Sequence, residues 1–242
     1  MRLDRYLAEA GIGTRSEVKK IIAKGRVTVN GSPVRDPSGK IGETSRICLD
    51  GKELSVSRYE YYMLYKPAGI ISASRVNTLQ RGVSVPAGEE RYAVDLIRGS
   101  GKTDLFPAGR LDKDTEGLLL ITNDGALAHR LLSPKFHVAK TYYAELSEAP
   151  GEEEIGELRR GTDIGDEKPT KPCGIEMISD TALYITLTEG RYHQIKRMFG
   201  KYGQEVIFLK RLRFGPLTLD EALRPGEYRK LSDEEIEALK QQ

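Results

Sequence analysis

One short segment combines an arginine and an aspartate with the pattern of a loop that leads into a buried strand. Gly109-Arg110-Leu111-Asp112 is followed, after five intervening residues, by the apolar run 118–121. Residues two apart point to the same side of an extended backbone, so Arg110 and Asp112 would face one space while Leu111 anchors the other side. This spacing is compatible with a catalytic acid and base. It is equally typical of an ordinary solvated surface pair, so the spacing alone leaves both interpretations open.

Two further segments carry side chains that could act on a substrate. The strand-like segment 140–146 places Tyr142 on the same face as Ala144 and Leu146, where a tyrosine usually belongs to the core. Lys196 lies in the segment 191–199, whose apolar residues recur at helical spacing. Composition alone therefore predicts a basic helix surface for Lys196.

Three motifs together resemble the pseudouridine synthases that act on ribosomal RNA, and most closely their RsuA branch. The first runs from Gly109-Arg110-Leu111-Asp112 through Asp114-Thr115-Glu116-Gly117-Leu118-Leu119-Leu120-Ile121-Thr122-Asn123-Asp124-Gly125. The second is Lys140-Thr141-Tyr142, and the third is Glu189-Gly190-Arg191-Tyr192-His193-Gln194-Ile195-Lys196-Arg197-Met198-Phe199. The long first motif makes this resemblance far more specific than a lone short match.

The resemblance implies a role for each candidate residue. It makes Asp112 the catalytic aspartate and Lys196 its ion-pair partner. Tyr142 would stack on the uracil and serve proton transfer, and Arg110 would fill the gap left by a flipped base. Asp114 and Glu116 are expected to be scaffold or surface residues, because no matching motif recruits them.

The implied reaction suits a single ionised carboxylate. Uridine becomes pseudouridine when the bond from ribose C1′ to uracil N1 breaks and the base rejoins through C5, with no redox change, so we expect no cofactor. Positive character develops at C1′, which Asp112 could stabilise or capture. Attack at C1′, attack on the uracil ring and removal of the ribose 2′ hydrogen all remain open for this carboxylate.

Composition narrows the class of protein further. The chain has 242 residues, of which 38% are hydrophobic, and its two cysteines, Cys48 and Cys173, form no Cys-x-x-Cys pair. His129 and His137 are not spaced as a metal pair, so we expect no metal site. No run reaches the roughly 18 apolar residues of a membrane span, and residues 1–4 do not resemble the start of a signal peptide. We therefore expect a globular cytoplasmic protein that has no membrane partner.

The N-terminal part carries a concentrated positive charge. The first 40 residues hold nine Lys and Arg against four Asp and Glu, or +5, although the whole chain is only +2. The pattern predicts a helix at 3–10, a second helix from Thr14 onward and a hairpin at Asn30-Gly31. Over about 45 residues, this arrangement resembles the S4 RNA-binding module. RNA phosphates are expected to meet the exposed cations of this module, namely Arg2, Arg5, Arg15, Lys19, Lys20, Lys24 and Arg26.

The sequence pattern of the rest of the chain predicts many short strands interrupted by a few helices. This pattern differs from the regular alternation of a doubly wound sheet and predicts an α+β protein. The resemblance implies a small S4-like domain at residues 1–59, followed at residues 60–242 by a catalytic domain whose mainly antiparallel sheet is flanked by helices. Residues 81–91 are expected to form an elongated surface loop.

The resemblance therefore implies a site-specific pseudouridine synthase, which we expect to act as a monomer on 16S ribosomal RNA, within a small-subunit assembly intermediate. Overall length and the ending Pro225-Gly226-Glu227-Tyr228-Arg229 favour this branch over the enzymes that modify 23S ribosomal RNA. A noncatalytic S4-type assembly factor or RNA chaperone would explain the basic N-terminus but not the three motifs. A hydrolytic glycosidase would need a second carboxylate that the sequence does not identify.

Overall fold

The structure is a computed structural model that describes residues 1–10, 12–42, 45–54, 59–73, 92–98, 100, 102 and 104–242. The expected loop at 81–91 lies outside the described residues. Contacts between Cα atoms divide the chain into an N-terminal unit, Met1–Tyr59 with Gly99–Thr103, and a C-terminal unit, Glu60–Arg98 with Asp104–Gln242. No helix in the described part of the chain is long and apolar enough to cross a membrane.

The N-terminal unit packs two helices against a small antiparallel sheet. The helices are α1 (Leu3–Glu9) and α2 (Arg15–Ala23), and Thr14 and Glu17 cap α2 through reciprocal bonds, as the sequence predicts. The strands are β1 (Val27–Val29), β2 (Ser32–Val34), β3 (Ile47–Leu49) and β4 (Lys52–Glu53), in the order β2-β1-β3-β4. Asn30 and Gly31 both have positive φ, which a tight hairpin between β1 and β2 requires.

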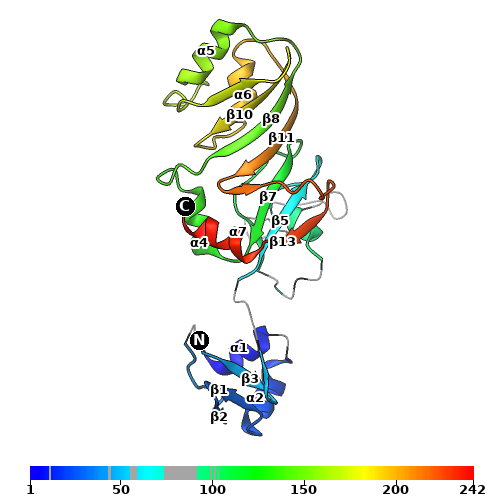
Figure 1. Ribbon diagram of the computed structural model, residues 1–242, viewed down its shortest axis with the longest axis vertical. Coiled ribbons are helices and arrows are strands. Elements are labelled where there is room, and N and C mark those ends of the chain that lie inside the picture. The colour runs from blue at the N-terminus through cyan, green and yellow to red at the C-terminus, as the bar shows by residue number, and fades with distance from the viewer. Residues whose placement is uncertain are drawn as a thin grey trace. The chain divides into compact units, whose positions relative to one another are not determined.

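The C-terminal unit is built on one large sheet (Figure 1). Its strands are β5 (Tyr61–Lys66), β6 (Phe106–Pro107), β7 (Glu116–Thr122), β8 (Lys140–Leu146), β9 (Gly174–Met177), β10 (Ala182–Leu187), β11 (Val206–Phe214), β12 (Leu217–Thr218) and β13 (Tyr228–Lys230). The order is β13-β5-β7-β11-β8-β10-β9, with β6 beside β7 and β12 beside β11. Among the strands that the structure describes in this sheet, every pair is antiparallel except β7 with β11, so the expected α+β fold with a mainly antiparallel sheet is confirmed.

Helices flank this sheet at both ends in Figure 1, with α5 and α6 near β10 and with α4 and α7 near the β5 side. Their bounds are α4 (Gly125–Leu132), α5 (Glu152–Arg160), α6 (Gln194–Gly200) and α7 (Asp233–Lys240), and a 3₁₀ turn, η1, covers Ala93–Leu96. Ser232 and Glu235 form a capping box at the start of α7. Because His193 adopts a left-handed backbone, α6 begins at Gln194 and not at Arg191, where the sequence suggested its start.

The parallel pair β7 and β11 lies at the centre of the unit. Arg211 of β11 is opposite Gly117 of β7, where φ is +101°. A Cβ atom at residue 117 would lie 2.2 Å from the carbonyl oxygen of Arg211, so only glycine allows this approach. Two apolar clusters form the core of the unit, one with residues of β8, β10, α5 and α6 and the other with residues of β5, β7 and η1, and Tyr142 of β8 packs against both.

Candidate active site

The loop that contains Arg110 and Asp112 joins β6 to β7. Leu111 is 6% exposed, whereas the Arg110 side chain is exposed and the Asp112 side chain is 30% exposed. The buried hydroxyl of Ser72 holds the backbone of Leu111 from both directions. It accepts a hydrogen bond from the Leu111 N–H at 3.0 Å and donates one to the Leu111 carbonyl at 2.8 Å. The prediction that Leu111 anchors this loop is therefore confirmed.

Lys66 at the end of β5 fixes the other half of the loop. Its fully buried Nζ donates to the carbonyl oxygens of Pro67, Lys113 and Thr115 at 2.9, 3.1 and 2.8 Å. Burial lowers the pKa of Lys66 to about 8, although nearby carboxylates, Asp114 first, oppose this shift. A cation held by three carbonyl groups orients the backbone on both sides of Asp114.

A pocket of about 320 Å³ brings the predicted site residues together. Arg110 and Asp112 from the loop, Tyr142 from β8 and Lys196 from α6 all line it. Apolar side chains of Leu187, Ile195 and Leu209 form part of its wall. Three segments far apart in the sequence thus supply a carboxylate, an aromatic ring and two cations to one cavity.

The structure corrects the predicted pairing of Lys196. Its Nζ lies 2.5 Å from Asp114 Oδ2, and this hydrogen bond is the main reason why the pKa of Asp114 is lowered. Asp112 instead faces His193, whose Nε2 lies 3.6 Å from Asp112 Oδ1. The chain turns at Lys113 and Asp114, which carries Asp114 toward the first turn of α6. Asp114 is exposed and has one specific partner, which agrees with the scaffold or surface role expected for it.

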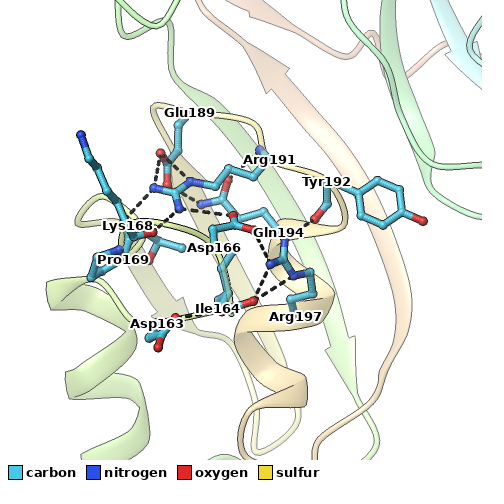
Figure 2. A network of polar contacts seen from close by, with 12 residues as sticks. Asp163, Ile164, Asp166, Lys168, Pro169, Glu189, Arg191, Tyr192, Gln194 and Arg197 are labelled. Carbon is cyan, nitrogen blue, oxygen red and sulfur yellow. Dashed lines mark hydrogen bonds and ion pairs between the residues drawn. The ribbon is translucent and has the colours of Figure 1, made fainter.

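A polar network holds the segment that places His193 (Figure 2). Arg191 donates to the Lys168 carbonyl at 2.5 Å and to Glu189 at 3.2 Å. Arg197 of α6 donates to Asp166 at 2.5 Å and to the Tyr192 carbonyl at 3.1 Å. These bonds connect the loop between α5 and β9 to the start of α6. These contacts hold residues 190–193 as one wall of the pocket.

Tyr192 is an exposed aromatic residue of this wall. Its side chain points away from the network in Figure 2 and is 68% exposed. The ring stacks on His193, with centroids 3.9 Å apart and an interplanar angle of 16°. The aromatic pair gives the pocket a flat rim beside Asp112.

The pocket residues that sequence reasoning missed include two buried cations, Lys140 and Arg211. Both are buried, at 9% and 2% exposure. The alternation of β8 could have identified Lys140, because it lies two residues before Tyr142 and shares its face. Arg211 offers only a weak signal, a cation within the strand pattern 206–214.

The predicted RNA-binding cations of the N-terminal unit differ in their surroundings. Arg2 pairs with Asp4 and Arg26 pairs with Asp50, whereas Arg5 is exposed at the start of α1. The remaining cations are exposed on or next to α2 and form no side-chain hydrogen bond or ion pair within the described ranges; they are Arg15, Lys19, Lys20 and Lys24.

The chain belongs to the RNA pseudouridine synthase family. The family model for RNA pseudouridylate synthase matches residues 60–201, and the S4 domain model matches residues 1–47. It is therefore an enzyme that isomerises uridine in RNA, with an S4 domain at its N-terminus.

Known pseudouridine synthases are similar to this protein over almost the whole chain. An uncharacterized RNA pseudouridine synthase of Bacillus subtilis, YtzG, is 43% identical and covers 99% of this chain and 98% of its own. The ribosomal small subunit pseudouridine synthase A of Vibrio cholerae is 38% identical over 99% of both chains. A crystal structure of a pseudouridylate synthase matches with a TM-score of 0.67 at 35% identity, over 99% of both chains.

Proposed function

We propose that this protein converts one specific uridine of 16S ribosomal RNA to pseudouridine, with Asp112 as the essential carboxylate. The observation that carries the proposal is the pocket itself, because Arg110, Asp112, Tyr142 and Lys196 converge on it. Relatives that are 38–40% identical and carry the name ribosomal small subunit pseudouridine synthase A support the 16S target. The enzyme acts in the cytoplasm, as a monomer, on a small-subunit assembly intermediate.

Base flipping explains how a stacked uridine reaches this pocket. Extruding a base costs a few kcal/mol, and the exposed Arg110 at the pocket mouth can occupy the vacated space. The flipped uracil stacks on Tyr142. Its ribose then lies at the mouth of the pocket, beside Asp112.

Asp112 acts at the sugar as an ionised carboxylate. Breaking the C1′–N1 bond leaves positive character on the ribose, which a carboxylate at the mouth of the pocket stabilises. Lys196 acts as a positioning residue, because its bond to Asp114 holds the turn that follows Asp112. The side chains of Ser72 and Lys66 hold the same loop through hydrogen bonds to its backbone carbonyl groups.

The experiment that tests the target is pseudouridine mapping in both ribosomal RNAs from cells that lack this protein. We expect one pseudouridine to disappear from 16S RNA and to return when the wild-type gene is restored, but not when the Asp112→Asn variant is supplied. Loss of a pseudouridine from 23S RNA alone would contradict the proposed target. An unchanged pattern in both RNAs would contradict the proposed function.

A further inference from the structure

Two cationic side chains are buried in the floor of the pocket without a carboxylate partner. Lys140 Nζ donates to the Val138 carbonyl at 2.9 Å, and Arg211 Nε donates to the Leu118 carbonyl at 2.7 Å. Arg211 Nη2 is buried and has no hydrogen-bond partner among the residues that the structure describes. No ion pair joins Lys140 or Arg211 to a carboxylate within the same described residues.

This arrangement is costly in the free protein. Removing a cation from water costs several kcal/mol when no counter-charge compensates. Burial first, and then the charge of Arg211, lower the pKa of Lys140 to about 8. The ring of Phe214 lies 5.6 Å from Lys140 Nζ and 5.2 Å from Arg211 Cζ, which offsets only part of that cost. A ligand that brings negative charge to the floor would offset the remainder.

The position of Tyr142 indicates which part of the nucleotide meets these cations. Lys140 lies two residues before Tyr142 on the same face of β8, and Arg211 of β11 is the direct cross-strand partner of Tyr142. Neighbours of this kind are about 5 to 7 Å apart. A base stacked on Tyr142 therefore directs one edge toward both cations. The phosphates stay with the ribose at the mouth, beside the exposed Arg110.

We propose that Lys140 and Arg211 stabilise the uracil anion that forms when the C1′–N1 bond breaks. The electron pair of that bond remains on uracil and is shared among N1, O2 and O4, while Asp112 compensates the positive ribose. After the base turns, C5 forms the new bond to C1′, the C5 proton is released to water, and N1 takes up a proton. The anion exists only after the C1′–N1 bond breaks and before the C1′–C5 bond forms. The cations therefore act on the reaction and not on substrate affinity. This inference rests on the proposed function of the pocket.

The test compares Lys140→Met with the wild-type protein on 16S ribosomal RNA transcript that carries tritium at uracil C5. We expect the single-turnover rate at saturating RNA to fall about 100-fold, the range found when one oxyanion donor is removed. The RNA dissociation constant and its dependence on salt should not change. Thermal stability should not fall, because the substitution removes a buried unpaired charge.

Two variants serve as controls. Lys140→Arg keeps the charge and should retain a rate clearly above that of Lys140→Met. Arg213→Met removes an exposed cation of the same strand as Arg211, outside the pocket lining, and should leave the rate unchanged.

Three outcomes would overturn the inference. The first is an unchanged rate for Lys140→Met. The second is weaker RNA binding with a salt slope reduced by about 0.9, which would identify a phosphate contact. The third is a lower melting temperature together with a rate that Lys140→Arg does not restore, which would identify a structural role. Failure of the proposed function is distinguishable from all three, because the wild-type protein itself would then release no tritium.

Discussion

Lys196 Nζ lies 2.5 Å from Asp114 Oδ2, while Asp112, two residues earlier, faces His193 Nε2 at 3.6 Å. The ion pair therefore stabilises the turn beside the proposed catalytic residue and not its carboxylate. The pair is partly exposed, at 25% for the Lys196 side chain and 70% for that of Asp114. Exposed pairs contribute little to stability, so the value of this contact would lie in the placement of Asp112.

A double-mutant cycle on Lys196→Met and Asp114→Asn tests this role. We expect each single variant to lower the single-turnover rate about 10-fold and the double variant to lower it no further, because both remove one contact. The free energy of unfolding should change by less than about 1 kcal/mol in each. Additive rate effects would contradict a shared role and would favour a separate action of Lys196 on the substrate.

Removing the Ser72 hydroxyl should affect both stability and catalysis. Ser72→Ala leaves the buried N–H and carbonyl of Leu111 without their partner, so we expect a loss of about 1 to 3 kcal/mol in urea unfolding. The catalytic rate should fall as well, since Leu111 precedes Asp112. Ser147→Ala is the matched control, because the Ser147 hydroxyl accepts one exposed backbone bond from Glu205. Equal losses in the two variants would contradict the assigned role of Ser72.

The buried Lys140 gives stability a defined pH dependence. Its pKa is about 8 in the folded protein and about 10.4 when unfolded, so both states hold the proton below pH 8 and the full cost of burial applies. Between these values the unfolded state binds more protons, and the free energy of unfolding rises with pH by up to about 1.4 kcal/mol per unit. Lys140→Met should lose this contribution. Urea unfolding from about pH 8 to about pH 10 checks it, and identical slopes for the two proteins would contradict it.

The cations of the N-terminal unit should differ in their contribution to RNA binding. Lys20 is exposed and has no ion pair among the described residues, whereas Arg26 pairs with Asp50. Each phosphate contact that is lost lowers the salt slope of log K by about 0.7 to 0.9. We expect Lys20→Gln to produce this loss and Arg26→Gln to produce a smaller one. Titrations of RNA at several salt concentrations measure both, and a larger effect of Arg26→Gln would contradict the prediction.

Local chemistry made much of the fold predictable. The capping boxes at Thr14 and Ser232 fix the starts of α2 and α7 through residues three apart, so sequence alone could locate them. The strand β9 was not predicted, because its four residues gain their order from pairing with β10 and not from their own pattern. The left-handed His193 that delays α6 depends on the surrounding network in the same way.

The candidate site was predictable as a set of residues but not as a set of contacts. The family motifs identified Arg110, Asp112, Tyr142 and Lys196, and one pocket contains all of them. Spacing could not decide whether Lys196 meets Asp112 or Asp114, because the turn between these residues determines which carboxylate approaches α6. Lys140 and Arg211 were missed because cations are expected at surfaces. Strand alternation could have placed Lys140 on the face of Tyr142, whereas the burial of Arg211 becomes visible only when β8 and β11 pair.

Tritium release from uracil C5 tests the central claim most directly. With 16S ribosomal RNA transcript as substrate, the wild-type protein should release tritium from one uridine per molecule. Asp112→Asn, which keeps the size of the side chain but removes its charge, should abolish release while RNA affinity stays nearly unchanged. Release by Asp112→Asn at a rate near that of the wild-type protein would contradict the account.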